Sequence, residues 1–224
     1  TFPPALYRMT DWHDFQMGES TASCWGGSLP RTADKTSSFT PVSMWAGKFG
    51  DDYTARNSGE HLPVNNRLFF EKCFARLVAA PSAVLELGAN RGDNIKALMK
   101  IWPAARFHAV EINWNAVKQL RQLPNTTVTA GSLLDCEFGE FQFDLVITKG
   151  VLIHMVPSDL PRVYETLYNS SRRYILMAEY YNPTPVEVPY RSRAGLMWKR
   201  DFAGEFMDRY PVRLVDYGFS YHRD

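Results

Sequence analysis

The chain has 224 residues and a nearly balanced charge, with 25 Lys and Arg against 24 Asp and Glu. This length suits one α/β domain with a buried core plus an appendage. A net charge of +1 gives no basic field that would favour nucleic acid as a partner. No apolar run reaches membrane-spanning length, and no signal-peptide pattern is visible.

Three cysteines, Cys24, Cys73 and Cys136, are scattered without the CxxC or Cys/His spacing of a zinc site. This pattern favours reduced thiols and no bound metal. We expect a cytoplasmic enzyme whose partner is a small molecule rather than a nucleic acid or a membrane. The composition is compatible with either a monomer or a homodimer.

Residues 1–40 contain many Ser, Thr, Gly and Pro residues and only isolated aromatic residues. No helical or strand period persists here, which is typical of an irregular extension. An arm packed on the domain and a pro-segment are both compatible with this composition. We assign this N-terminal extension no function.

Residues 41–80 are predicted to form a helical cap. Trp45, Phe49 and Tyr53 recur every fourth residue and so share one face of a short helix. This aromatic face would either only pack against the domain or form a lid over a cofactor. As a lid, it would offer the polar ends of Tyr53, Arg56 and Asn57.

The clearest pattern in the chain begins at residue 83. Ala83–Leu87 is an apolar run, a glycine-bearing turn follows, and apolar residues then recur at helical spacing. This order of strand, tight loop and helix is typical of a nucleotide-cofactor crossover. A dinucleotide fingerprint requires glycine at the first, third and sixth loop positions. Counting from Gly88, Asn90 and Asp93 occupy the latter two positions, so the fingerprint fails twice.

Glu86, at the end of this strand, indicates a different cofactor. A carboxylate there would repel a pyrophosphate, whereas it suits S-adenosylmethionine, which carries a sulfonium and an ammonium group. Gly88 and Gly92 would let the backbone approach the methionine and ribose parts. This is the motif of class I methyltransferases, except that one of their usual glycines is Asn90 here. The cofactor contacts expected in this loop are those of Glu86, Gly88, Ala89, Asn90 and Gly92.

Two further strand ends follow at suitable distances. The strand Arg106–Ile112 contains Glu111, 19 residues after Gly92, which could accept hydrogen bonds from both ribose hydroxyls; an exposed strand-end Glu is the alternative. In methyltransferase-like folds the end of the next strand, Thr127–Ala130, flanks the adenine. Asp135 there is almost equally compatible with a solvated turn. The cofactor contacts expected at these two ends are Glu111, Ile112, Ser132, Leu133 and Asp135.

The fourth strand begins at Phe143, and its apolar run Leu145–Ile147 predicts burial on both faces, as in a parallel sheet. Its exit loop must lie beside the cofactor, because open α/β sheets bind ligands at the carboxyl ends of their strands. We expect Lys149 and Gly150 to contact the cofactor. His154 is the first candidate for a general base; a histidine that only caps or packs the next helix is the alternative.

The fifth strand, Arg173–Glu179, leads into an aromatic and proline-rich loop. Asn182–Pro185 invites comparison with the Asn-Pro-Pro-aromatic motif of amine-methylating nucleic-acid enzymes, but that motif follows the fourth strand, so we reject the match. The two prolines would instead stiffen a loop over the pocket. Tyr180 and Tyr181 are further candidates for catalysis.

Acceptor contacts are expected on both sides of this loop. Four cations between residues 189 and 201 favour either an anion-binding insertion or a solvated loop. The candidate acceptor-binding residues are Glu179, Asn182, Tyr190, Arg191, Arg193 and Lys199.

A helix at Asp201–Tyr210 and a strand at Val212–Tyr221 close the chain. We therefore expect residues 81–224 to form an α/β, Rossmann-like class I methyltransferase domain, with a mostly parallel sheet and helices on both faces. A complete seven-stranded sheet of this kind would add a final antiparallel strand. That strand is expected to be missing or truncated.

Beyond the fold, the chain from about Met44 to Asp224 resembles the pseudaminic acid biosynthesis-associated methylase family. The phrases that carry the resemblance are Trp45–Asn57, Leu85–Asn94, Val110–Asn113, Lys149–His154, Ala178–Pro185, Lys199–Glu205 and Asp216–Phe219. The segment Arg191-Ser192-Arg193 departs from the family's usual Arg-Gly pair, which leaves the acceptor loop open.

This resemblance implies an S-adenosylmethionine-dependent methyltransferase that acts on O or N of a small polar acceptor, namely a nonulosonic (pseudaminic-type) sugar acid or its precursor. His154 would be its base, and Arg191 with Arg193 would hold an acceptor carboxylate or phosphate. A non-catalytic S-adenosylmethionine-binding partner in a glycan-assembly pathway is one alternative. A nicotinamide-dependent oxidoreductase is another, and Glu86 with the missing glycines argues against it.

Overall fold

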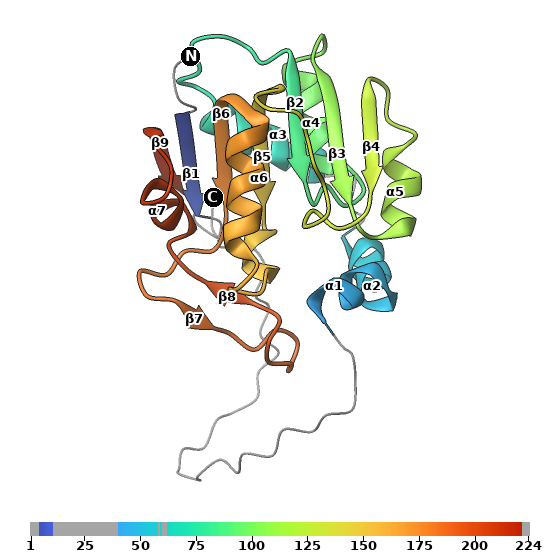
Figure 1. The fold of residues 1–224 in the computed structure, drawn as a ribbon. Coiled ribbons are helices and arrows are strands. Elements are labelled where there is room, and N and C mark those ends of the chain that lie inside the picture. Colours follow the sequence, from blue (N-terminus) through green and yellow to red (C-terminus); the bar gives the residue numbers. More distant parts are fainter. Residues whose placement is uncertain (1–4, 11–39, 58, 60–61, 221–224) are drawn as a thin grey trace.

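A seven-stranded sheet forms the centre of the computed structural model, which describes residues 5–10, 40–57, 59 and 62–220. The strand order is β4-β3-β2-β5-β6-β1-β9, and every neighbouring pair runs parallel (Figure 1). The strands are β1 (Ala5–Thr10), β2 (Ala83–Leu87), β3 (Arg106–Glu111), β4 (Thr126–Ala130), β5 (Phe143–Lys149), β6 (Ser171–Ala178) and β9 (Arg213–Phe219).

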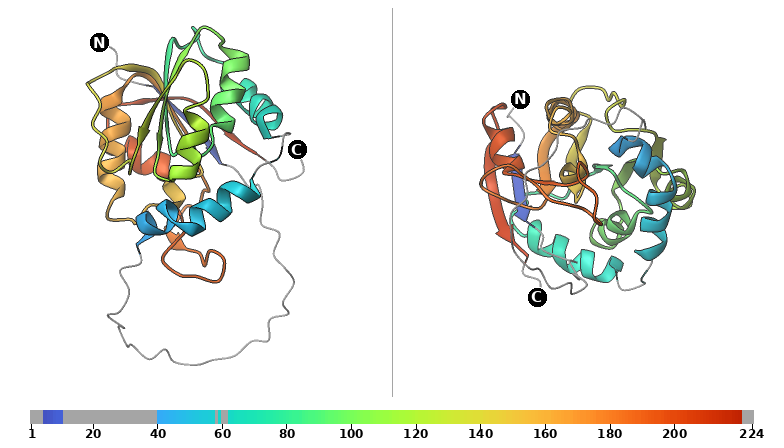
Figure 2. Two further views of the ribbon diagram at one scale, coloured as in Figure 1. Left: turned by 90° about the vertical axis from the view of Figure 1, so that its right-hand side faces the viewer. Right: turned by 90° about the horizontal axis from the view of Figure 1, so that it is seen from below.

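Helices cover both faces of this sheet, which the left view of Figure 2 shows nearly edge-on. Phe70, Leu98 and Leu120 belong to the apolar core on one face, and Leu167 and Phe206 belong to the core on the other. Strand β5 is buried from Phe143 to Thr148, because both of its faces are covered. The helices are α3 (Leu62–Cys73), α4 (Asp93–Ile101), α5 (Trp114–Leu120), α6 (Leu160–Ser170) and α7 (Phe202–Met207).

The predicted parallel α/β architecture is confirmed, with one correction at the N-terminus. Ala5–Thr10, expected to be irregular, is strand β1 between β6 and β9, and it pairs parallel with both. Ala5 lies opposite Tyr174 of β6 and Arg213 of β9. Among the described residues the central sheet has no antiparallel strand, and its seventh strand is β1. Apart from Thr40, the rest of the predicted extension lies outside the described residues.

Two short segments lie beyond the carboxyl ends of the strands and together form what we call the cover. The first consists of α1 (Pro41–Ala46) and α2 (Lys48–Arg56), and the second is the antiparallel hairpin of β7 (Val186–Glu187) and β8 (Trp198–Lys199). Both lie below the sheet in Figure 1. Thr40 and Ser43 cap the start of α1 reciprocally, as in a capping box. The cover therefore occupies the edge of the sheet where ligands bind in this class of fold.

The predicted aromatic stripe runs across the break between α1 and α2. The ring of Trp45 lies 5.2 Å from Phe49 and 5.2 Å from Tyr53, both with edge-to-face geometry. The hairpin meets the same cluster, because Tyr190 lies 5.9 Å from Phe49. The two parts of the cover are thus packed together by aromatic rings.

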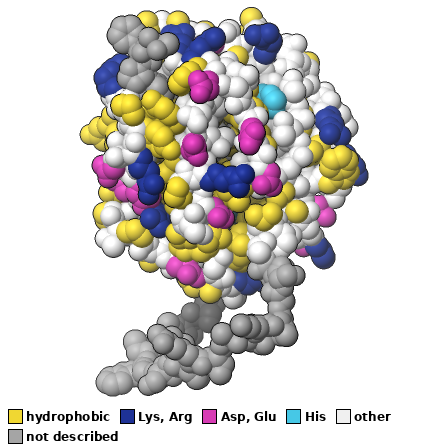
Figure 3. Space-filling model, in the orientation of Figure 1, with side chains coloured by type: hydrophobic (Ala, Val, Ile, Leu, Met, Phe, Trp, Pro, Cys, Tyr) yellow, Lys and Arg dark blue, Asp and Glu magenta, His cyan; other side chains and the backbone are white. Residues whose placement is uncertain are grey.

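Charges of both signs are interspersed on the surface seen in Figure 3, where Lys and Arg side chains lie among Asp and Glu rather than in one basic patch. None of the helices in the described part of the chain has the length and apolar character that a membrane crossing requires.

Candidate cofactor and acceptor site

A cavity of about 990 Å³ lies at the carboxyl ends of the strands, beneath the cover. Its walls come from the loops that follow β2, β3, β4 and β5, from α1 to α3, and from the tip of the hairpin. This volume is at the upper end of the range of roughly 300–1,000 Å³ usual for small-molecule sites. It can therefore hold a cofactor together with a small acceptor.

The glycine loop (residues 88–92) forms part of the cavity floor. Gly88 has φ of 73°, and a Cβ atom there would meet Val151 at 2.6 Å, so only glycine fits. Ala89 and Asn90 line the cavity beside it. Gly92 has a different role from the one predicted: it does not line the described walls, and a Cβ there would meet Leu123 at 2.6 Å. Gly92 allows the loop to pack on the end of α5 and the residues after it.

Glu111 is the buried carboxylate of the cavity floor. Its Oε2 accepts a hydrogen bond from the backbone N–H of Asn90 at 2.6 Å, and its Oε1 accepts one from that of Asn113 at 2.7 Å. Burial raises the pKa of Glu111, although these backbone donors oppose the shift. The carboxylate thus joins the ends of β2 and β3, and Ile112 lines the cavity next to it.

Glu86 lies behind the cavity wall rather than on it. Its Oε1 accepts from Nδ2 of Asn94 at 2.6 Å, while its Oε2 has no partner within the described part of the chain. Burial raises the pKa of Glu86 to about 8, even though the charge of Lys149 opposes this shift. The prediction of a direct cofactor contact needs correction, because the cavity wall here is Asn94.

Only some of the residues that were predicted to flank the adenine line the cavity. Ser132 and Leu133 line the cavity together with Gly131. Asp135 does not: its side chain is exposed and lies 3.9 Å from Nη2 of Arg162. The turn interpretation of Asp135 is therefore the better one.

His154 lies in the short 3₁₀ helix η1 (Leu152–His154) and lines the cavity. Its Nδ1 lies 2.8 Å from the carbonyl oxygen of Leu196, and its ring packs at 4.7 Å from Trp45 and 5.0 Å from Tyr190. Because a carbonyl oxygen can only accept, Nδ1 carries the hydrogen and Nε2 keeps a lone pair. Burial lowers the pKa of His154 to about 4, so the ring is neutral at physiological pH.

Two of the predicted residues after β6 have structural roles. Glu179 is buried and accepts from the backbone N–H groups of Val151 at 3.1 Å and Ile153 at 3.4 Å. Burial raises its pKa to about 7. It therefore orders the loop after β5 instead of facing an acceptor. Asn182 likewise donates to the carbonyl of Thr184 in its own loop, and neither residue lines the described walls.

The predicted tyrosine pair and cations divide into two groups. Tyr180 lines the cavity, with Nζ of Lys199 at 5.5 Å from its ring, and Lys149 and Gly150 also line it. Three further residues of the predicted site do not line the described walls of the cavity: Tyr181, Arg193 and Lys199.

The tip of the hairpin carries Tyr190 and Arg191 into the cavity wall. Tyr190 and Arg193 form an antiparallel bridge, and Arg191 and Ser192 between them have φ of 50° and 62°. Positive φ at both central residues is typical of a type I′ turn, which glycine and asparagine usually supply. The guanidinium of Arg191 lies 5.9 Å from the ring of Tyr190.

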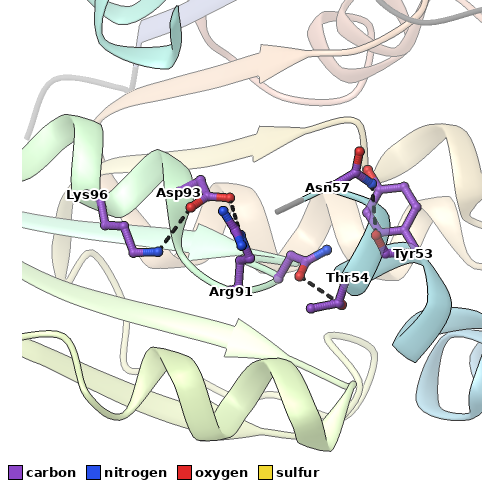
Figure 4. Close-up of polar contacts among 7 residues, drawn as sticks. Tyr53, Thr54, Asn57, Arg91, Asp93 and Lys96 are labelled. Atoms are coloured by element: carbon purple, nitrogen blue, oxygen red, sulfur yellow. Dashed lines mark hydrogen bonds and ion pairs between the residues drawn. The ribbon is translucent and has the colours of Figure 1, made fainter. Parts of the chain in front are cut away.

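Helix α2 contributes the predicted polar residues of the cover and one that was missed. Tyr53, Arg56 and Asn57 line the cavity, and Asn57 donates to the Tyr53 carbonyl at 3.1 Å. Thr54 was missed: it is buried, and its hydroxyl donates to Oδ1 of Asn90 at 3.0 Å (Figure 4). Figure 4 also shows Asp93 at the start of α4, which pairs with Arg91 and Lys96.

Other cavity residues absent from the predicted site include Trp45, Asn94 and Asn113. Two of them could have been found from the sequence, since Trp45 opens the aromatic stripe and Asn113 is the N-cap of α5. No group of three or more His, Cys, Asp or Glu side chains in the described ranges comes together in a way that could hold a metal ion.

Comparisons with known proteins agree with this architecture. The family model described as a methyltransferase domain matches residues 84–173. No curated protein matches the chain.

Among solved structures, the chain is similar to 1,6-didemethyltoxoflavin-N1-methyltransferase of Burkholderia thailandensis, with bound 1,6-didemethyltoxoflavin and S-adenosylhomocysteine. That match has 17% identity and a TM-score of 0.57 and covers 81% of this chain and 80% of the other. The mitomycin 7-O-methyltransferase MmcR matches with 12% identity and a TM-score of 0.57, over 76% of this chain and 54% of the other.

The plantazolicin methyltransferase BpumL in complex with SAH matches with 14% identity and a TM-score of 0.48, over 61% of this chain and 56% of the other. The chain thus spans about half the length of that protein. At these identities the likeness concerns the fold. The chain therefore has the Rossmann-like fold of class I methyltransferases, and the match to the methyltransferase-domain model spans residues 84–173 within it.

Proposed function

We propose that the protein transfers the methyl group of S-adenosylmethionine to a hydroxyl group, or less readily a nitrogen, of a small polar acceptor. One observation carries this proposal: a single cavity joins the glycine loop and Glu111 to the neutral His154. The first pair suits the cofactor, and the histidine suits an acceptor that must lose a proton. The two groups belong to different loops at the same edge of the sheet.

The residues on the cavity floor fit S-adenosylmethionine better than a dinucleotide. The conformation of Gly88 brings the backbone to the cavity surface, and Glu111 offers carboxylate oxygens for ribose hydroxyls. Backbone groups of Ala89 and Asn90 would hold the methionine part, and Ser132 with Leu133 would flank the adenine. The cofactor supplies a methyl group that its sulfonium has already activated.

The protein's part in the reaction is positioning and proton removal. Nε2 of His154 would take the proton of the acceptor hydroxyl as the oxygen forms its bond to the methyl carbon and the carbon–sulfur bond breaks. The hydrogen bond from Nδ1 to Leu196 fixes the ring for this task. The cover would exclude water and hold the acceptor in line with the methyl group.

For the acceptor, we propose a sugar acid of the nonulosonic, pseudaminic type or its precursor. Arg191 on the cavity wall can bind a carboxylate or phosphate, and the rings of Tyr180 and Tyr190 suit the apolar face of a sugar. The Burkholderia thailandensis structure holds a small-molecule acceptor, 1,6-didemethyltoxoflavin, which supports an acceptor of this size.

Transfer of isotope-labelled methyl from S-adenosylmethionine into a cell lysate tests this proposal. The products are separated into small-molecule, glycan and protein fractions, and the His154→Ala variant serves as the inactive control. Label in a sugar or sugar-nucleotide fraction is the expected result. Label only in another fraction would overturn the proposed acceptor. Cofactor binding without any transfer would favour a non-catalytic S-adenosylmethionine-binding protein.

A further inference from the structure

Asn90 connects three parts of the site. Its backbone lies in the left-handed region, with φ of 47°, which asparagine tolerates better than most residues. Its backbone N–H donates to Glu111 at 2.6 Å. Its side-chain oxygen accepts from the hydroxyl of Thr54 at 3.0 Å, the bond that Figure 4 marks at Thr54. The class I motif usually has a glycine at this position, and a glycine could make the first bond but not the second.

Polar contacts of this kind join helix α2 directly to the loops that follow β2 and β3. Within α2, only Gly50 and Thr54 are buried, so few of its side chains add to the apolar core. Asp51 accepts hydrogen bonds from the side chains of Asn113 at 2.9 Å and Asn115 at 2.8 Å. The helix is therefore fastened at two points about one turn apart. Asp51 binds residues that follow β3, and Thr54 binds the loop that follows β2.

Both fastening points lie at the proposed cofactor site. Asn90 and Asn113 line the cavity, and both donate a backbone N–H to Glu111, the proposed ribose contact. On α2, Thr54 and its neighbour Tyr53 line the same cavity. A ligand held between α2 and the glycine loop leaves faster when this helix separates from the loop.

We propose that Asn90 is a positioning residue whose side-chain bond to Thr54 holds α2 closed over the bound cofactor and thereby prolongs its residence. This inference rests on the proposed function, since it takes the ligand to be S-adenosylmethionine or its product. Thr54 is buried, and its hydrogen bond to Asn90 joins α2 to the glycine loop, which form two walls of the cavity. The bond can therefore form only when α2 lies closed against this loop.

The test compares Thr54→Val, which keeps the shape of the side chain but removes the donor, with Asn90→Gly, which removes the acceptor without straining the backbone. Hydrogen exchange of the amides of residues 51–57 is measured in the ligand-free protein, and the dissociation rate of S-adenosylhomocysteine is measured by displacement. A hydrogen bond of ordinary strength corresponds to about fivefold in an opening equilibrium. We expect both variants to exchange and release about fivefold faster.

Two controls separate this effect from a general loss of stability. Thr54→Ser retains the hydroxyl and should restore both rates to those of the wild type. Thr166→Val removes a comparable hydroxyl, which donates to the carbonyl of Arg162 on α6, and should leave both rates unchanged. Exchange in β5 reports global unfolding and should rise by a similar factor in Thr54→Val and Asn90→Gly, because the unfolded chain also lacks the bond.

Exchange of residues 51–57 in Thr54→Val at the same rate as in Thr166→Val would overturn the inference. So would faster exchange in β5 while residues 51–57 exchange at the wild-type rate, because the bond would then not break when α2 opens. If the wild type binds no S-adenosylhomocysteine, the proposed function fails, while exchange in the ligand-free protein still decides whether the bond between Asn90 and Thr54 holds α2 closed.

Discussion

The floor and the cover of the cavity are held in different ways. On the floor, the buried carboxylates Glu111 and Glu179 accept backbone N–H groups of the neighbouring loops, and Gly88 fits closely against Val151. The cover is held by side-chain hydrogen bonds, such as those of Asp51, and by the aromatic rings around Trp45. This difference is the basis of our proposal that α2 can separate from a floor whose loops are held by buried backbone hydrogen bonds.

His154 lies where floor and cover meet, and its replacement should have the largest effect. Removal of a general base typically costs 10²–10⁴-fold in rate, so His154→Ala should lower kcat by about 100-fold or more with little change in cofactor affinity. The matched control is His108→Gln, since His108 contacts Thr129 within the sheet and should leave kcat within about twofold. An unchanged kcat in His154→Ala at saturating acceptor would exclude this role.

The pH profile sharpens the same prediction. Because burial lowers the pKa of His154 to about 4, the base stays neutral and active from pH 8 down to about pH 5. Below that, kcat should fall as the ring becomes protonated. A fall that is centred near pH 6.5, the value of an unperturbed histidine, would contradict the buried environment described for this ring.

The pH dependence of stability tests whether Glu86 is buried away from water. Its folded-state pKa is about 8, raised above the ordinary 4.5, so between these values the folded protein keeps a proton that the unfolded chain has lost. The contribution of Glu86 to stability therefore declines as pH rises from 5 to 8, by roughly 3 kcal/mol.

The Glu86→Gln variant lacks this titration, and urea unfolding at pH 5 and pH 8.5 measures the difference. We expect its stability relative to the wild type to improve at the higher pH. The other buried carboxylates are common to both proteins and cancel in the comparison. Parallel pH dependences for the two proteins would mean that water reaches Glu86.

Arg191 tests the acceptor side of the cover. Arg191→Ala should raise KM for an anionic acceptor about tenfold, the equivalent of one charge-assisted hydrogen bond, and should leave kcat nearly unchanged. Arg193→Ala is the matched control, because Arg193 does not line the described walls of the cavity. Equal effects of the two substitutions would point to general electrostatic attraction rather than to a contact of Arg191.

The smallest effect concerns the turn that carries Arg191. Ser192 has φ of 62°, and Ser192→Gly should relieve this strain and stabilise the protein by about 0.5 kcal/mol. Ser158→Gly is the control, since Ser158 is exposed in a turn without positive φ and should gain nothing. Thermal unfolding at matched conditions measures both, and a loss of stability in Ser192→Gly would show that the serine side chain has another role.

The floor was easier to predict from sequence than the cover, because its signals are local. An apolar run, a glycine turn and an acidic strand end lie within 30 residues of one another. These signals were enough to predict β2, β3 and the positions of Gly88 and Glu111 at the cavity. Gly92 was misassigned because its packing partners, Leu120 and Leu123, lie about 30 residues further on. Strand β1 was missed because its pairing partners are more than 150 residues away.

For similar reasons the acceptor side was predicted only in part. The strand-end position of Glu179 suggested a ligand contact, but the loop after β5 folds back and satisfies its carboxylate. The cluster of cations predicted that the hairpin segment binds an anion. The cations alone did not predict the tight turn, which places Arg191 in the cavity wall and leaves Arg193 outside it. Thr54 carried no sequence signal, because its role depends on a loop 36 residues later.

The central claim is that the cavity floor binds S-adenosylmethionine, and calorimetric titration with S-adenosylhomocysteine tests it most directly. The wild type should bind one equivalent, and Glu111→Gln should bind at least about tenfold more weakly, because the carboxylate joins Asn90 to Asn113 and is the proposed ribose acceptor. Binding of NAD without S-adenosylhomocysteine, or equal affinities of the two proteins for S-adenosylhomocysteine, would contradict the account.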